Sequence, residues 1–317
     1  MKTDGSEPKR RSWALTELHI TIVYCIGIFA ASWVSQLAGI RAVRGDLGNG
    51  AITPWLIVAM ITPALGVLLL MAFYWPVRGK SCGRRIGARS RLLPVRTDPH
   101  VSSFGMIVVF SWMGWGRSAW FEFSPAGVQV MAGRWLLGRG TQGWPLFLCN
   151  IAITTTAYSL VAMILGAGEE LGWRGYLQGR LIERFGLSRG IIVLGLLWSF
   201  WHLPLLLAGY NYPEHPVLGA FILSPVLLVA ASFFMAWLTL RTQSFWPAAL
   251  AHGAGDSIQG GLMSSIKTSL PGLYLYLTEL AFILIVGVIF FILLLFSDSE
   301  QPGSGRTHST QGSLYGY

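Results

Sequence analysis

Three short clusters of ionisable residues interrupt the apolar stretches of this sequence. They lie in the segments 166–177 (GAGEELGWRGYL), 196–204 (LLWSFWHLP) and 247–257 (PAALAHGAGDS). Their ionisable residues are Glu169, Glu170, Arg174, His202, His252 and Asp256. Charged groups among apolar residues are costly unless they pair or serve a function. These residues are therefore the first candidates for chemistry.

Helical spacing would bring several of these groups together. Glu170 and Arg174 are four residues apart, as are His252 and Asp256, so each pair shares one face of a helix. Glu169 is turned by about 100° from Glu170, so one carboxylate can pair with Arg174 while the other faces a cavity. Each cluster alone could be structural, as a helix-holding ion pair or a buried histidine. The three together favour a functional site.

A carboxylate beside two imidazoles can hydrolyse an acyl bond. A carboxylate next to an imidazole can hold and deprotonate a water molecule, and a second imidazole with a neighbouring hydrogen-bonding group can stabilise an oxyanion. Pro204, two residues after His202, should kink or end its helix near the imidazole. Ser199 and Ser257 lie nearby, but neither is in a GxSxG turn, so no serine nucleophile is predicted.

A zinc site is the competing interpretation of the same residues. His202, His252 and Glu169 could together ligate Zn²⁺. However, the sequence has no HExxH motif and the two histidines are 50 residues apart. We therefore predict no metal and no other cofactor, with zinc as the alternative. The three cysteines are far apart and form no CxxC pair, so they predict neither a disulfide framework nor a metal site: Cys25, Cys82 and Cys149.

The composition indicates that membrane helices position these groups. Of 317 residues, 53% are hydrophobic and only 12% are charged, which fits a polytopic membrane protein and neither a soluble enzyme nor a disordered chain. Five segments have the roughly 20 apolar residues that a span needs: 18–39, 52–75, 144–165, 217–240 and 270–296. Three weaker segments are 101–115, 188–207 and 245–263. We predict an all-α bundle of about eight transmembrane helices.

Basic residues predict the orientation of this bundle. Lys9, Arg10 and Arg11 precede the first span, the loop 78–96 is strongly basic, and the loop 208–216 has no Lys or Arg. Both termini should therefore be cytoplasmic. We expect a cytoplasmic N-terminal segment (1–17), a transmembrane domain (18–296) and a disordered cytoplasmic tail (297–317). The segment 116–143 is predicted to be an outside loop or an interfacial helix. The net charge of +9 fits an anionic lipid surface better than a nucleic-acid partner.

The three clusters, in this order, resemble the CAAX prenyl protease and bacteriocin-processing family of intramembrane glutamate proteases. The family pattern is Glu-Glu-x-x-x-Arg, then aromatic-x-x-x-His, then His-x-x-x-Asn/Asp. Here the motifs begin at Glu169, Trp198 and His252, and the resemblance covers about residues 145–260. Phe commonly stands at the position of Trp198. Asp256 ends the third motif where Asn is the other choice, and an ionised Asp cannot donate to an oxyanion, so Asp256 would be protonated or would orient His252.

The resemblance also implies roles for these residues. Glu169 would be the general base that activates water, with help from His202, and His252 and Asp256 would stabilise the oxyanion. The remaining motif residues would hold the site or bind substrate: Glu170, Arg174 and Trp198. An eight-helix fold with a cavity open to the cytoplasmic side is implied as well.

We therefore expect an integral-membrane endopeptidase that cleaves a membrane-anchored protein or peptide, of the prenylated CAAX type or not. The expected location is a prokaryotic plasma membrane, with the lipid bilayer and the substrate as partners. Two alternatives stay open at this point. A membrane scaffold or bacteriocin-immunity protein could keep the motifs for structure or binding. A transporter could use the buried charges as an ion path, but it would predict discontinuous helices in two matching halves.

Overall fold

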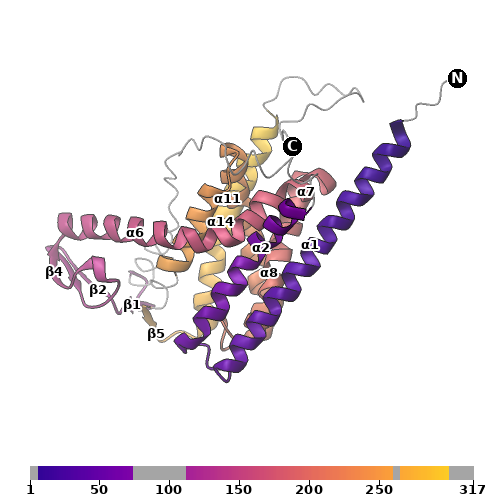
Figure 1. Cartoon of the computed structure of the whole chain (residues 1–317). Helices are drawn as coiled ribbons and strands as arrows, with labels where there is room; N and C mark the ends of the chain where they lie inside the picture. The colour runs from indigo at the N-terminus through magenta and orange to yellow at the C-terminus, as the bar shows by residue number, and fades with distance from the viewer. Residues whose placement is uncertain (1–5, 74–111, 260–264, 300–317) are drawn as a thin grey trace.

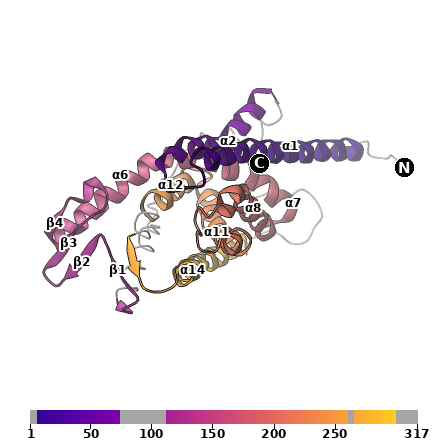
Figure 2. The same cartoon turned by 90° about the horizontal axis from the view of Figure 1, so that it is seen from below.

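The computed structural model of the chain describes residues 6–73, 112–259 and 265–299. These residues form a bundle of helices accompanied by two small antiparallel sheets (Figures 1 and 2). The helices are α1 (Ser6–Ala42), α2 (Thr53–Phe73), α6 (Trp144–Glu170), α7 (Gln178–Phe185), α8 (Leu187–Trp201), α9 (Leu203–Leu207), α10 (Pro216–Leu218), α11 (Ser224–Thr242), α12 (Trp246–Ala254) and α14 (Gly272–Ser299). The predicted all-α class is confirmed, with the sheets as an addition.

Short helical turns extend these helices. Three are π-helical: η3 (Leu171–Leu177) joins α6 to α7, η4 (Gly219–Leu223) precedes α11, and η5 (Gly255–Gln259) follows α12. Two are 3₁₀ turns, η1 (Gly50–Ile52) and η2 (Trp135–Leu137). Single π-helical turns are rare and often occur at functional sites.

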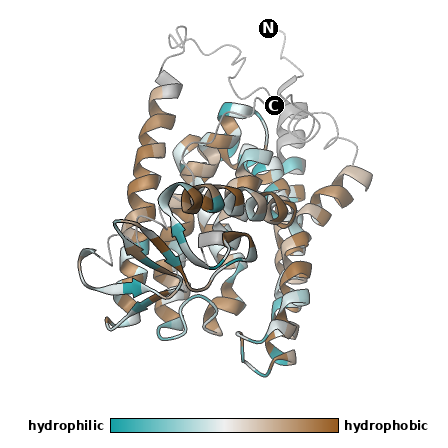
Figure 3. Cartoon of the chain, turned by 90° about the vertical axis from the view of Figure 1, so that its left-hand side faces the viewer, coloured by the Kyte–Doolittle hydropathy of each residue, from teal (hydrophilic) through white to brown (hydrophobic). Residues whose placement is uncertain are grey.

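Among the described residues, five helical stretches are long and apolar enough to cross a membrane: Glu17–Ala42, Gly50–Phe73, Trp144–Phe185, Pro216–Thr242 and Gly272–Phe296. They overlap the five strong predicted spans, although the third continues past residue 165 to Phe185. Their ribbons carry mostly the colour of hydrophobic residues (Figure 3), and many of their large apolar side chains are exposed. The chain is an integral membrane protein. The weaker span 188–207 corresponds to the apolar helix α8 followed by α9. The described part of the weaker span 245–263, up to residue 259, holds the short α12 and η5.

Several predictions fall on residues that the structure leaves undescribed. Most of the weak span 101–115 and the basic loop 78–96 lie outside the described residues, as does the tail from residue 300. The total of eight spans and the division of the chain at 17 and 297 therefore stay predictions.

The segment 116–143 forms β-strands, so an interfacial helix was the wrong expectation. Strands β2 (Phe121–Ser124), β3 (Gly127–Val130) and β4 (Gly140–Gly143) make a three-stranded antiparallel sheet beside the start of α6 (Figure 1). Strand β1 (Gly116–Ser118) pairs with β5 (Ile266–Thr268). Pro125 and Ala126 turn the chain between β2 and β3, and the alternation of apolar and polar residues on either side buries Val128 and Val130 on one face. Period-two alternation around a turn is a hairpin pattern.

Close packing of α6 on α12 brings the first and third ionisable clusters together. A Cβ atom at Gly166 of α6 would lie 2.8 Å from the carbonyl oxygen of Ala249, and one at Gly253 of α12 would lie 2.5 Å from backbone atoms of Ala162 and Met163. Only glycine allows the two backbones to approach this closely.

The main hydrophobic core contains three tryptophans beside the ionisable clusters. Trp173, Trp198 and Trp201 are at most 4% exposed. Trp173 lies in η3, and the other two lie at the end of α8. The second cluster therefore lies among large buried aromatic side chains, while His202 itself keeps partial exposure.

Candidate active site

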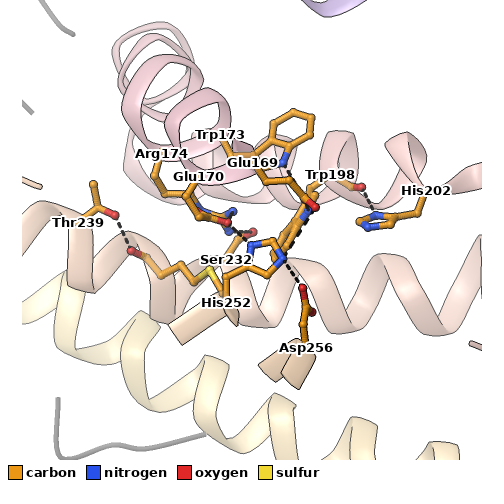
Figure 4. A network of polar contacts seen from close by, with 11 residues as sticks. Glu169, Glu170, Trp173, Arg174, Trp198, His202, Ser232, Thr239, His252 and Asp256 are labelled. Carbon is orange, nitrogen blue, oxygen red and sulfur yellow. Dashed lines mark hydrogen bonds and ion pairs between the residues drawn. The ribbon is translucent and has the colours of Figure 1, made fainter. Parts of the chain in front are cut away.

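The first and third clusters form one buried network (Figure 4). The Oε1 atom of Glu170 accepts hydrogen bonds from Arg174 Nη1 at 2.9 Å and from His252 Nδ1 at 2.8 Å. Arg174 also donates to the hydroxyl of Ser232 at 3.2 Å, and its guanidinium lies 4.4 Å above the ring of Trp198. Glu170 and Arg174 are fully buried, so each charge depends on its partner.

Glu169 is held by two indole groups. Its Oε2 atom accepts hydrogen bonds from Trp198 Nε1 at 2.9 Å and from Trp173 Nε1 at 3.4 Å. Its Oε1 atom lies 3.9 Å from His252 Nε2. One carboxylate oxygen is therefore anchored, while the other faces the imidazole.

His202 is placed by the end of a helix. Helix α8 ends at Trp201, and Pro204 lies at the start of α9, as the sequence predicts. The Nδ1 atom of His202 lies 2.9 Å from the carbonyl oxygen of Trp198. A carbonyl oxygen can only accept, so Nδ1 carries the hydrogen and Nε2 is left as an acceptor. Trp198 connects this imidazole to the first cluster, because its ring lies 6.3 Å from that of His202 and its Nε1 atom donates to Glu169.

Asp256 lies at the open side of the site. Its Oδ2 atom is 3.3 Å from His252 Nε2, and its side chain is 55% exposed. Tyr210, in the loop after α9, lies close to the same carboxylate. Partial burial raises the pKa of the Tyr210 phenol, and the negative charge of Asp256 raises this pKa further. Tyr210 is therefore a neutral phenol in the neighbourhood of Asp256.

The structure brings together all the predicted site residues. The pairs Glu170–Arg174 and His252–Asp256 form as their four-residue spacing predicts. Three further contributors were not predicted: Trp173, Ser232 and Tyr210. Trp173 lies four residues after Glu169, so helical spacing alone could have identified it. Ser232 and Tyr210 come from other parts of the chain, and no local pattern points to them.

The zinc alternative requires at least three protein ligands around one point. Within the described residues, no group of three His, Cys, Asp or Glu side chains is arranged to hold a metal ion. Glu169 Oε1, Glu170 Oε1 and Asp256 Oδ2 instead lie around one imidazole, that of His252.

Comparison with known proteins confirms the resemblance predicted from the motifs. Residues 143–258 match the model of the family described as type II CAAX prenyl endopeptidase Rce1-like. A CAAX prenyl protease 2 from Methanococcus maripaludis is 46% identical over 44 residues. This alignment covers 14% of the present chain and 16% of the archaeal protein. The matched region contains every residue of the buried network and begins where β4 meets α6.

Proposed function

We propose that this chain is an intramembrane endopeptidase that hydrolyses a peptide bond of a membrane-associated protein with a water molecule activated by Glu169. One observation carries the proposal. A buried carboxylate has one oxygen fixed by two indole N–H groups and leaves the other toward an imidazole. A fixed and partly shielded carboxylate of this kind is suited to take a proton from water.

The reaction follows from the hydrogen-bonding capacity of each group. Glu169 Oε1 accepts one hydrogen of the water, and His202 Nε2 accepts the other. The water oxygen attacks the carbonyl carbon while its proton passes to Glu169. The carbon–nitrogen bond then breaks, and Glu169 returns the proton to the leaving amine. Both products are released without a covalent enzyme intermediate.

His252 is proposed to stabilise the oxyanion. Glu170 holds the Nδ1–H of His252, which orients Nε2 toward the reacting centre. A proton on Nε2, shared with Asp256 Oδ2 at 3.3 Å, can be donated to the negatively charged oxygen. Asp256 thus orients His252, and Glu170 with Arg174 holds the imidazole from its other side.

The substrate is proposed to be a membrane-anchored protein of the prenylated CAAX type. The archaeal relative carries that activity in its name. We further propose that both termini are cytoplasmic, because basic residues precede the first span, and that the protein resides in a prokaryotic plasma membrane.

A cleavage assay on purified protein tests this function. The wild type, Glu169→Ala and His202→Ala would each be given a farnesylated CAAX peptide, the same peptide without the lipid, and a plain membrane segment. The expected result, measured by mass spectrometry, is cleavage by the wild type and only slow residual cleavage by both variants. If no peptide is cleaved and both variants are merely less stable, the motifs are structural and a scaffold or immunity role replaces the protease.

Removal of metal ions should leave this activity unchanged. Glu169 supplies the base and the His252 imidazole supplies the oxyanion contact, so no metal-bound water is needed. The measurement is the cleavage rate after treatment with a strong chelator and passage over a desalting column, compared with the rate after added Zn²⁺. A loss of activity that Zn²⁺ restores would show that the zinc interpretation is right.

Replacing Trp198 with phenylalanine should lower kcat/KM by about 10- to 100-fold, the effect of losing one hydrogen bond to a charged group. Phenylalanine keeps the aromatic ring under Arg174 but removes the N–H that holds Glu169 Oε2. Trp246→Phe is the matched control, because Trp246 is 38% exposed at the start of α12. Equal activity of the two variants would contradict the anchoring of Glu169 by Trp198.

A further inference from the structure

The end of α8 is held by a helix from outside the region that matches the family model. The carbonyl oxygen of Trp201 is the last of α8, and carbonyl groups at a helix end have no partner within the helix. Two side chains of α1 donate to it: Gln36 Nε2 at 2.9 Å and Trp33 Nε1 at 3.1 Å. Gln36 also donates to Ser32 Oγ at 2.8 Å.

Gln36 is an unusual residue for this position. It is fully buried in a span that should lie within the bilayer, where polar side chains are costly. Its Oε1 atom has no hydrogen-bond partner among the described residues. The buried Oε1 atom therefore lowers the stability of the fold, whereas the Nε2 atom donates to Ser32 and to the carbonyl oxygen of Trp201. We infer that the contact with this carbonyl oxygen is the reason for a glutamine at this position.

That carbonyl group belongs to Trp201, whose ring contacts both His202 and Trp173. The ring of Trp201 lies 4.6 Å from the ring of His202 and 6.1 Å from the ring of Trp173, edge-on to both. His202 follows directly in the chain, and Trp173 donates to Glu169. Fixing Trp201 thus fixes both the helix end that presents His202 and an aromatic support of Glu169.

We propose that Gln36 and Trp33 are positioning residues that hold the break between α8 and α9 and thereby set the place of His202 relative to Glu169. This inference rests on the proposed function for its catalytic consequence, but the geometry can be tested without it. It also gives α1 a part in the site, although α1 carries none of the motif residues.

The double variant Gln36→Met/Trp33→Phe tests the proposal. Gln36→Met keeps the length of the side chain, Trp33→Phe keeps an aromatic ring, and together they remove the two donors. We expect kcat to fall by about 10-fold or more with little change in KM, as the loss of two hydrogen bonds predicts. The fall should disappear when the same changes are made in a His202→Ala background, because residues that act through one group are not additive.

Ser35→Ala is the matched control. Ser35 lies on the same helix and donates to the carbonyl oxygen of Trp55 at 2.7 Å, a bond of the same kind that leads away from the site. This variant should keep the kcat of the wild type. An equal fall in kcat in Ser35→Ala, or a fall that persists without His202, would show a general loss of helix packing and overturn the proposal.

Hydrogen–deuterium exchange gives a measurement that does not depend on activity. The backbone amides of residues 202, 203 and 205–207 should exchange faster in the double variant than in the wild type and in Ser35→Ala. Unchanged exchange would overturn the positioning role even if the protein is a protease. Faster exchange in the double variant, together with a wild type that cleaves no peptide, would retain the positioning role and remove the proposed function.

Discussion

Replacing Glu169 with glutamine is expected to lower kcat by about 10²- to 10⁴-fold, the usual effect of losing a general base. The amide has the shape of the carboxylate, and its oxygen can still accept hydrogen bonds from the indoles of Trp173 and Trp198. It cannot take a proton from water. The fold should therefore survive while the chemistry is lost.

The measurement is the single-turnover cleavage rate, together with the melting temperature in the same detergent. Glu183→Gln in α7 is the matched control, since Glu183 is an exposed glutamate that follows the first motif along the chain. This variant is expected to keep wild-type activity. If Glu169→Gln cleaves within about 10-fold of the wild type, far less than the loss of a base requires, another group, such as His202, is the base.

Spacing predicted the local pairs of this site well. Glu170–Arg174 and His252–Asp256 each lie one helical turn apart, so the regular geometry of the helix fixes them before any tertiary contact forms. The end of α8 beside His202 was likewise predictable, because Pro204 cannot donate within a continuing helix.

Residue spacing could not predict the contacts between helices that complete the site. The bond between Glu170 and His252 joins residues 82 positions apart, and it depends on the close approach of α6 and α12 at Gly166 and Gly253. The cap on Trp201 comes from α1, 165 positions before it in the case of Gln36. The periodicity of apolar residues within one helix does not indicate which face of another helix it will contact.

The sheet shows a different limit. The segment 116–143 is rich in glycine and aromatic residues, and its short strands have too few residues for a strong periodic pattern. Pairing decides its structure: β1 pairs with β5, about 150 residues later in the chain, and β2 and β4 flank β3. Strand formation that depends on distant partners is poorly predicted from local preference.

Replacing Arg174 with methionine is expected to destabilise the protein by about 3–5 kcal/mol, because it leaves a buried carboxylate without its counter-charge. Arg174 and Glu170 are both fully buried, so water cannot replace the lost partner. Glu17→Gln is the matched control. It breaks the ion pair of Glu17 with Arg180, which spans 3.6 Å with the glutamate 42% exposed, and exposed pairs contribute about 1 kcal/mol or less. Denaturant unfolding in mild detergent measures both, and adding Glu170→Gln to Arg174→Met should recover part of the loss. Equal stability of the two single variants would mean that the buried charge of Glu170 does not need Arg174, and that its contact with His252 at 2.8 Å is sufficient.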